Sequence, residues 1–268
     1  DGEAHAWCAL GDAALALGQL REAEQTYQQT KRILHEQLLA TQPDLPRWLR
    51  DLAVAHNRLG DVRMKQGQLD AAAQAFIEDL TISTRLVALD PANTGWLRGL
   101  AVAHSKLGDV RMAQGQLDAA AQAFSEGLAI NTQLVALDPA NTGWLRGLAV
   151  AHSKLGDVRM EQKQLDAAAQ AFSESMAIFT RLVALDPVNS SWQYDLAIAL
   201  AKLGQCNVYM RKPKASVLLL RKAESQLSQL VQQSPDHAKW RAALQIIHQD
   251  LRQLSPSSGK PTHRPKRR

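Results

Sequence analysis

Three histidines recur along the chain at a fixed interval, which makes them the first residues to test for metal chemistry. His56, His104 and His152 lie 48 residues apart. Imidazole nitrogens bind zinc at about 2 Å, whereas successive copies of a stacked helical unit lie about one helix diameter, roughly 10 Å, apart. The three rings therefore cannot bind one ion together, and no cysteine or carboxylate accompanies them at ligand spacing. We predict no metal site and interpret the histidines as half-buried packing residues.

Motifs of catalysis are missing from the sequence. It contains no Gly-rich phosphate loop, no nucleophile elbow and no HExxH zinc motif. Its polar residues are instead copied from one unit to the next, whereas a catalytic centre needs a set of residues that occurs once. We therefore predict no catalytic residues, no cofactor and no enzymatic activity.

Repeated polar rows form the strongest candidate for a binding surface. Within each unit, basic, small, acidic and thioether side chains follow one another at steps of three and four residues, the spacing of one helix face. The candidate residues are Arg50, Asn57, Arg58, Asp61 and Met64 in the first copy, Arg98, Val102, Ser105, Lys106, Asp109 and Met112 in the second, and Arg146, Ser153, Lys154, Asp157 and Met160 in the third. Apolar and thioether side chains beside charges suit adaptable peptide binding.

The same rows allow a plainer interpretation, a solvated helix face inherited by duplication. Lys106 lies three residues before Asp109, and Arg58 lies three before Asp61. Such neighbours form ordinary helix-surface ion pairs, each worth a few tenths of a kcal/mol. The residues alone leave both interpretations open.

One period of 48 residues organises the elements that must position these rows. Tryptophan recurs at Trp48, Trp96, Trp144, Trp192 and Trp240. Residues 96–115 carry apolar or small side chains at three- and four-residue steps, which predicts an amphipathic helix. Residues 116–138 predict a second helix, which the Asp-Pro pair at 138–139 ends. No strand-like alternation occurs, so each unit is expected to be a pair of helices in an all-α fold.

Several residues of the units match a known repeat signature. The first unit contains Trp7, Leu10, Gly11, Gly18, Ala23 and Tyr27, and a later one Leu107, Gly108, Gly115, Ala120 and Phe124. These residues resemble the signature of the tetratricopeptide repeat family, W-x2-L-G-x2-Y…A-x3-F…P over 34 residues. The resemblance extends to about residue 233, and the longer period here adds about two turns to each helix. It implies a right-handed α-solenoid (superhelix) of antiparallel helix pairs, about five pairs in all, whose first helices line a concave groove.

The period also predicts the boundaries of the units. We expect a solenoid over residues 1–254, with units at about 1–42, 43–90, 91–138, 139–186 and 187–234. A one-sided amphipathic segment over 236–254 is expected to be a capping helix, with Trp240, Leu244, Ile247, Leu251 and Leu254 facing inward. The N-terminal end has no equivalent cap, so we expect the chain to be part of a longer protein.

Charge is concentrated at the C-terminal end. The formal net charge is +5, and five of the basic residues lie in residues 255–268, which contain no acid. We expect that segment to be a disordered basic tail, or else a nucleic-acid patch, and the remainder to be neutral. Nucleic acid is therefore not expected to bind except through the tail. The two cysteines and the lack of an apolar run of about 20 residues favour a cytoplasmic protein with no membrane partner.

These observations lead to one main functional hypothesis. The resemblance implies a protein–protein interaction scaffold or sensor module, which binds a peptide or helical segment of a partner in its concave groove. The acidic and thioether rows favour a ligand with basic and apolar anchor residues. The alternative is an RNA-binding helical-repeat solenoid, which the neutral body disfavours. Self-association through the uncapped N-terminal end is a further possibility, and the near-identical long repeats suggest a bacterial origin.

Overall fold

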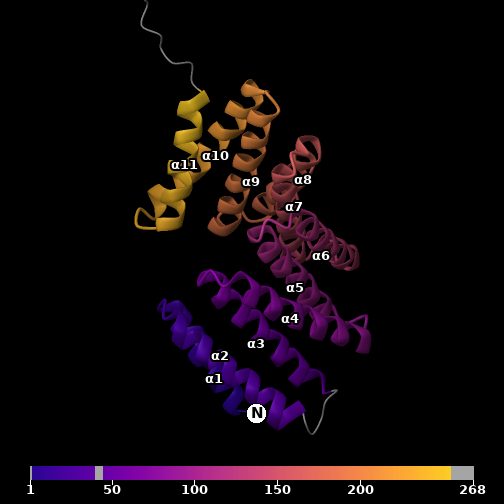
Figure 1. Ribbon diagram of the computed structural model, residues 1–268. Helices are drawn as coiled ribbons and strands as arrows, with labels where there is room; N and C mark the ends of the chain where they lie inside the picture. The colour runs from indigo at the N-terminus through magenta and orange to yellow at the C-terminus, as the bar shows by residue number, and fades with distance from the viewer. Residues whose placement is uncertain (1, 40–44, 255–268) are drawn as a thin grey trace, which may run out of the picture. The chain divides into compact units, whose positions relative to one another are not determined.

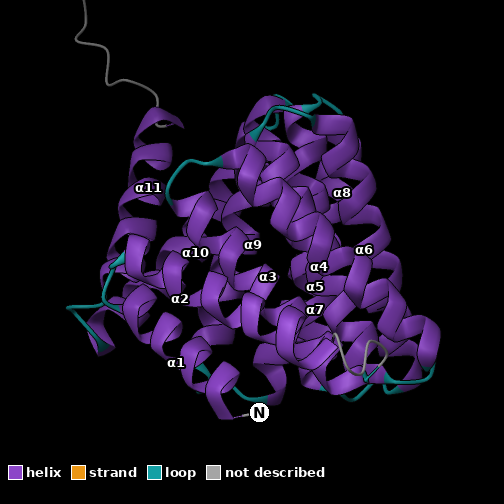
Figure 2. Ribbon diagram, turned by 60° about the horizontal axis from the view of Figure 1, so that its bottom comes forward, coloured by secondary structure: helices purple, strands orange, loops and turns teal. Residues whose placement is uncertain are grey.

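The computed structural model describes residues 2–39 and 45–254, and all of its regular structure in that part is helical (Figures 1 and 2). The elements are α1 Gly2–Ala16, α2 Leu20–Ile33, a π-helical segment η1 Leu34–Leu39, α3 Pro46–Lys65, α4 Leu69–Leu89, α5 Thr94–Ala113, α6 Leu117–Leu137, α7 Thr142–Glu161, α8 Leu165–Leu185, α9 Ser190–Tyr209, α10 Pro213–Gln233 and α11 Ala238–Leu254. The predicted all-α class is confirmed, and the helices over 96–115 and 116–138 are found as α5 and α6.

The chain divides into two compact units, Asp1–Lys163 and Gln164–Arg268. In the first unit, α1 packs on α2, α3 on α4 and α5 on α6, and each second helix also packs on the first helix of the next pair. In the second unit, α8 packs on α9, α9 on α10 and α10 on α11. Within each unit, short turns such as those between α3 and α4 and between α9 and α10 join helices that run antiparallel. The predicted helix-pair architecture is thereby confirmed, while the six predicted segment boundaries stay a prediction.

Glycine in the Leu-Gly pair of each signature allows the two helices of a pair to approach closely. A Cβ atom on Gly60 would lie 2.4 Å from Cε1 of Phe76, and one on Gly108 would lie 2.4 Å from Cε1 of Phe124. Both rings are buried, with 1% and 2% of their surface exposed. A side chain at either glycine would displace a ring from the core, so the signature spacing sets how the second helix packs on the first.

Turns between first and second helices require a left-handed residue directly after the C-cap. Gly115 supplies it with φ +73°, and its N–H and that of Gln116 donate to carbonyls of the last turn of α5. At the equivalent position after α7 and after α9, Lys163 and Arg211 adopt φ values of 61° and 57°. These two residues carry a Cβ atom where glycine is favoured, so their backbones are strained.

The C-terminal helix α11 follows the predicted pattern of faces. Ile247 and Leu251 are buried, and Trp240 is half-buried with its ring stacked on that of His237 at 3.9 Å between centroids. Arg241 faces solvent. The predicted tail, 255–268, lies outside the described residues.

The cysteines and the apolar character of the helices bear on the cellular compartment that the sequence suggested. Cys8 is half-buried and Cys206 is buried, both are free thiols, and burial raises the pKa of each. Within residues 2–39 and 45–254, none of the helices combines the length and apolar character needed to cross a bilayer.

Candidate peptide-binding surface

Two pockets of the first compact unit lie between successive first helices. The α3–α5 pocket has a volume of about 590 Å³ and is lined from α3, α4, α5 and the turn before α5. The α5–α7 pocket has a volume of about 290 Å³ and is lined from α5, α6 and α7. Most of their lining positions are 48 residues apart, such as Val54 and Val102, or Trp96 and Trp144. The pockets are therefore two copies of one feature of the repeat.

Apolar side chains line each pocket near solvent. Val54 and Val102 are each 43% exposed, although they lie on helices whose opposite face is core. Trp96 lies in the first turn of α5, where its backbone N–H donates to Oδ1 of the N-cap Asn93 at 3.1 Å. The same arrangement positions Trp144 on α7. Several other lining residues are glycine or alanine, such as Ala53, Gly95 and Gly99 in the α3–α5 pocket, so space remains for an apolar group.

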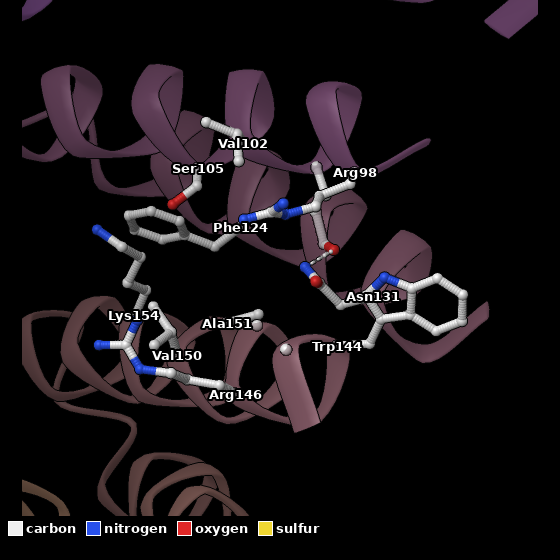
Figure 3. A pocket seen from close by; sticks show the side chains of 14 residues that line it. Arg98, Val102, Ser105, Phe124, Asn131, Trp144, Arg146, Val150, Ala151 and Lys154 are labelled. Carbon is white, nitrogen blue, oxygen red and sulfur yellow. Dashed lines mark hydrogen bonds between the residues drawn. The ribbon is translucent and has the colours of Figure 1, made fainter. Parts of the chain in front are cut away.

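Figure 3 shows the α5–α7 pocket from close by. Val102 and Ser105 lie on one wall and Val150 on the opposite wall, with the Phe124 ring between the two helices and Trp144 at one end. The pocket is lined by Arg98, Arg146 and Lys154 and by no acidic side chain.

Basic and acidic rows pair between helices and not along one helix. Lys106 Nζ lies 2.5 Å from Oδ1 of Asp61, so it links α5 to α3. Lys154 Nζ lies 2.5 Å from Oδ1 of Asp109, which links α7 to α5 in the same way. The carboxylate that Lys106 contacts therefore belongs to the preceding pair of helices and not to Asp109, three residues away. We call these ion pairs between successive first helices the ladder. Asp61 and Asp109, which we expected to contact basic residues of a ligand, contact Lys106 and Lys154 instead.

Arginine takes the same place in the first rung of the ladder. Arg58 Nε lies 3.2 Å from Oδ1 of Asp12, which links α3 to α1. Its side chain is 42% exposed and that of Asp12 48% exposed, so this pair is screened by solvent and contributes little to stability.

The structure divides the predicted binding residues into three groups. Those that line a pocket are Arg50, Asn57, Arg58, Arg98, Val102, Ser105, Arg146 and Lys154. Those that form the ladder without lining either pocket are Asp61, Lys106 and Asp109. The remainder are half-buried residues that line neither pocket, Met64, Met112, Ser153, Asp157 and Met160. Met64 and Met112 pack against the clusters around Phe76 and Phe124, so the thioether row belongs largely to the core.

The second helix contributes polar residues that the pattern of the first helices does not predict. Asp79 of α4 lines the α3–α5 pocket, yet only 4% of its surface is exposed. Its Oδ2 accepts a hydrogen bond from Nδ2 of Asn57 at 2.8 Å, and its Oδ1 accepts one from Oγ of Ser83 at 3.1 Å. Burial raises the pKa of Asp79 to about 6, although both hydrogen bonds lower it. The signal in the sequence was an acidic residue three positions after Phe76, on the buried side of the second helix.

In the next pair of helices this polar group is replaced. Gly127 stands 48 residues after Asp79, and Asn131 stands 48 after Ser83. Asn131 Nδ2 donates to the carbonyl oxygen of Gly127 at 2.8 Å (Figure 3). Both residues line the α5–α7 pocket. Equivalent pockets therefore have chemically different inner walls.

Histidines at the tryptophan position of the signature pack near the second helix. His56 is buried, and burial, followed by the charge of Lys31, lowers its pKa to about 4. Burial also lowers the pKa of His104, whose Nδ1 lies 3.0 Å from Oε2 of Glu126. The lowered pKa values favour the neutral form of both rings. Among residues 2–39 and 45–254, no three histidine, cysteine or carboxylate side chains are grouped so that they could hold a metal ion.

Comparison with known proteins connects this architecture to a repeat family. The model of the tetratricopeptide repeat matches residues 4–30, and no curated protein sequence matches the chain. Among solved structures, the apo form of RapI aligns with a TM-score of 0.63 at 13% identity, covering 94% of this chain and 80% of that chain.

Two further solved structures align over most of their length. One is a Podosopora anserina protein with nearly identical TPR-like repeats, assigned as a kinesin light chain (TM-score 0.59, 14% identity, 84% of this chain and 95% of that chain). The other is BtubC (BKLC) from P. vanneervenii (TM-score 0.58, 14% identity, 92% and 96%). The resemblance inferred from the sequence is thus confirmed: residues 4–30 form a tetratricopeptide repeat, and the chain has the fold of tetratricopeptide-like repeat proteins.

Proposed function

We propose that the chain is a scaffold for protein–protein interaction, which binds a segment of another protein across the first helices α3, α5 and α7. One observation carries the proposal: equivalent pockets, each with a partly exposed valine and a tryptophan, recur in register with the repeat. Helical-repeat proteins use such extended surfaces for binding, and tetratricopeptide-like folds are generally interaction scaffolds. A repeated pocket suits a ligand that is itself a chain.

The distance between the pockets sets the spacing of the ligand's anchor residues. Successive first helices lie roughly 10 Å apart. An extended chain advances about 3.3 Å per residue, so anchors at positions i and i+3 would reach both pockets. A helical ligand advances about 1.5 Å per residue and would need anchors at about i and i+7.

The chemistry of the walls favours an apolar anchor beside Val102. Val102 lies between the two pockets and lines both of them. The basic anchor expected from the acidic row is not supported at Asp61 or Asp109, because Lys106 and Lys154 already contact those carboxylates. An apolar side chain placed beside Val102 would instead be removed from water at no electrostatic cost.

A peptide selection with a charged variant tests the proposal. The whole chain would be presented to a phage library of random dodecapeptides, alongside Val102→Asp and the control Leu137→Asp. Val102 and Leu137 are 43% and 58% exposed, so neither substitution disturbs the core. We expect wild type and the control to enrich peptides that share an apolar anchor residue, and Val102→Asp to enrich none of them. Equal enrichment and equal Kd values for all three proteins would refute the proposal.

An RNA-binding function is the alternative hypothesis from the sequence. The RNA-binding solenoid gains no support from the matched repeat or from the similar structures. Self-association through the N-terminal end and a cytoplasmic location stay predictions. So does the absence of an enzymatic activity, although tetratricopeptide-like proteins are typically scaffolds.

A further inference from the structure

The helices α4 and α6 are nearly identical in sequence, so the positions at which they differ are informative. They differ at five positions, of which Asp79 and Ser83 of α4 are buried, whereas Thr81 and Arg85 face solvent. The two buried differences are the ones that line the pockets, as Asp79 and Ser83 in one copy and as Gly127 and Asn131 in the other. A third difference in the pockets, Asn57 against Ser105, lies on the first helices. We call these three positions of each copy the pocket floor.

We propose that the pocket floor selects the side chain that each pocket accepts. The α3–α5 pocket takes a lysine or arginine side chain of the bound segment, with Asp79 as its hydrogen-bond acceptor, and the α5–α7 pocket takes an apolar side chain. The inference rests on the proposed function, because it names the ligand chemistry of the same surface.

Asp79 has unused acceptor capacity and lacks a cationic donor. A carboxylate offers about four lone-pair sites, and Asp79 uses them for two hydrogen bonds, both from the neutral groups of Asn57 and Ser83. A buried charge is stable only when it is paired, and the raised pKa of Asp79 reflects this deficit. An ammonium or guanidinium group in the pocket would supply the missing positive charge.

Three of the cations near the pocket contact a carboxylate, so they repel a ligand cation less strongly than unpaired cations would. Arg50 contacts Asp51 at 3.1 Å and Arg58 contacts Asp12 at 3.2 Å. Deeper between the helices, the charge of Lys106 is balanced by Asp61. Arg98, which lines both pockets, is the cation on the α5 side. Asp79 is thus the buried charge toward which a ligand cation would be drawn.

The α5–α7 pocket offers the opposite environment. Gly127 removes the carboxylate from its floor, and Asn131 is turned toward the carbonyl of Gly127 (Figure 3). A ligand cation in this pocket would find no acid among the lining residues in the place of Asp79. The basic lining residues are Arg98, Arg146 and Lys154, of which Lys154 contacts Asp109. Its smaller volume, about 290 Å³ against about 590 Å³, also suits a shorter side chain.

The chain contains its own control for testing this inference. Asp79→Asn removes the charge and keeps the size of the side chain. A triple variant, Asn57→Ser with Asp79→Gly and Ser83→Asn, gives the first pocket the floor that the second pocket already has. Far-UV circular dichroism would establish that both variants fold. Each would be presented, as the whole chain, to the same random dodecapeptide library as wild type.

We expect wild type to enrich peptides with lysine or arginine at one position and an apolar residue at another. Both variants should keep the apolar preference and lose the basic one. A selected peptide should bind Asp79→Asn at least about tenfold more weakly than wild type, whereas its norleucine analogue should bind both proteins equally.

Two outcomes separate the inference from the proposed function. If wild type enriches apolar peptides without a basic position, or if the basic preference survives in Asp79→Asn, the assignment of Asp79 is wrong and the binding surface stands. If wild type enriches no peptide at all, the proposed function itself fails.

Discussion

Replacement of Asp79 by asparagine should stabilise the protein at neutral pH, although it removes a charge from a hydrogen-bonded network. Asparagine has nearly the same shape, and its side-chain oxygen can still accept from Nδ2 of Asn57. The hydroxyl of Ser83, which now donates to Asp79, can rotate to accept from the new amide. The substitution removes the unfavourable free energy of keeping a carboxylate ionised where only 4% of the residue is exposed.

The size of the effect follows from the pKa of Asp79. It is raised from 3.8 to about 6, so ionisation is about 3 kcal/mol less favourable in the folded chain than in the unfolded one. Between these two values the folded state binds more protons than the unfolded state, and stability therefore falls as the pH rises through this window. The destabilisation is fully present above about pH 6 and is lost below about pH 3.8. Asparagine does not titrate, so it is free of this dependence.

We therefore expect Asp79→Asn to raise the free energy of unfolding by up to about 3 kcal/mol near pH 7.5, and by about 1 kcal/mol near pH 4.5. Urea unfolding followed by circular dichroism would measure both differences. Because helical repeats can unfold unit by unit, hydrogen exchange of the α4 amides should be measured as well, to give the local stability of α4. Asp70→Asn, at an exposed carboxylate of the same helix, serves as the control for the loss of one charge from α4.

Two results would refute this reasoning. One is a loss of stability in Asp79→Asn at both pH values, which would mean that the hydrogen bonds to the charged form outweigh its burial. The other is a gain that is equal at both pH values, which would mean that ionisation of Asp79 is not its source.

Three further substitutions test how the helix pairs are built. In thermal unfolding, Gly60→Ala should destabilise the first unit by about 1–3 kcal/mol, because the new Cβ would lie 2.4 Å from Phe76. The control is Gly99→Ala, whose new Cβ would have no neighbour within 4 Å. It should stabilise the unit by about 0.5–1 kcal/mol. Lys163→Gly should raise Tm, because it relieves about 1–2 kcal/mol of strain at φ 61°, and an unchanged or lower Tm would contradict this. Asn93→Ala should cost about 1 kcal/mol in urea unfolding by removing the N-cap of α5, and Asn93→Gly should cost much less.

Local interactions explain why most of the fold could be predicted. The period of the apolar residues specifies each helix, and a proline or a left-handed glycine such as Gly115 ends it within one turn. The glycine of the Leu-Gly pair determines how closely the two helices of a pair pack, because Gly60 leaves room for the ring of Phe76. These features need only neighbours within one helix or one hairpin, and they were recognisable in the residues themselves.

The ion pairs could not be predicted in the same way. Lys106 has an acidic residue three positions along its own helix, Asp109, and another 45 positions earlier, Asp61. Local helix geometry places only Asp109 within reach of the Lys106 side chain. The stacking of α5 on α3 is what brings the ammonium group to 2.5 Å from Asp61. For the same reason the helix-face pattern did not show that Met64, a predicted binding residue, packs against the buried cluster around Phe76.

By itself, the sequence determined that this protein is a series of helix pairs related to the tetratricopeptide repeat, because helix periodicity, capping and close packing at glycine are encoded within 48 residues. Only the tertiary structure decided what lies between the pairs. It brings Asn57 of α3 against Asp79 of α4 and opens both to the pocket beside α5, whereas Gly127 leaves the next pocket uncharged at that point. The charge of a buried side chain depends on which neighbours exclude water from it, and those neighbours come from other helices.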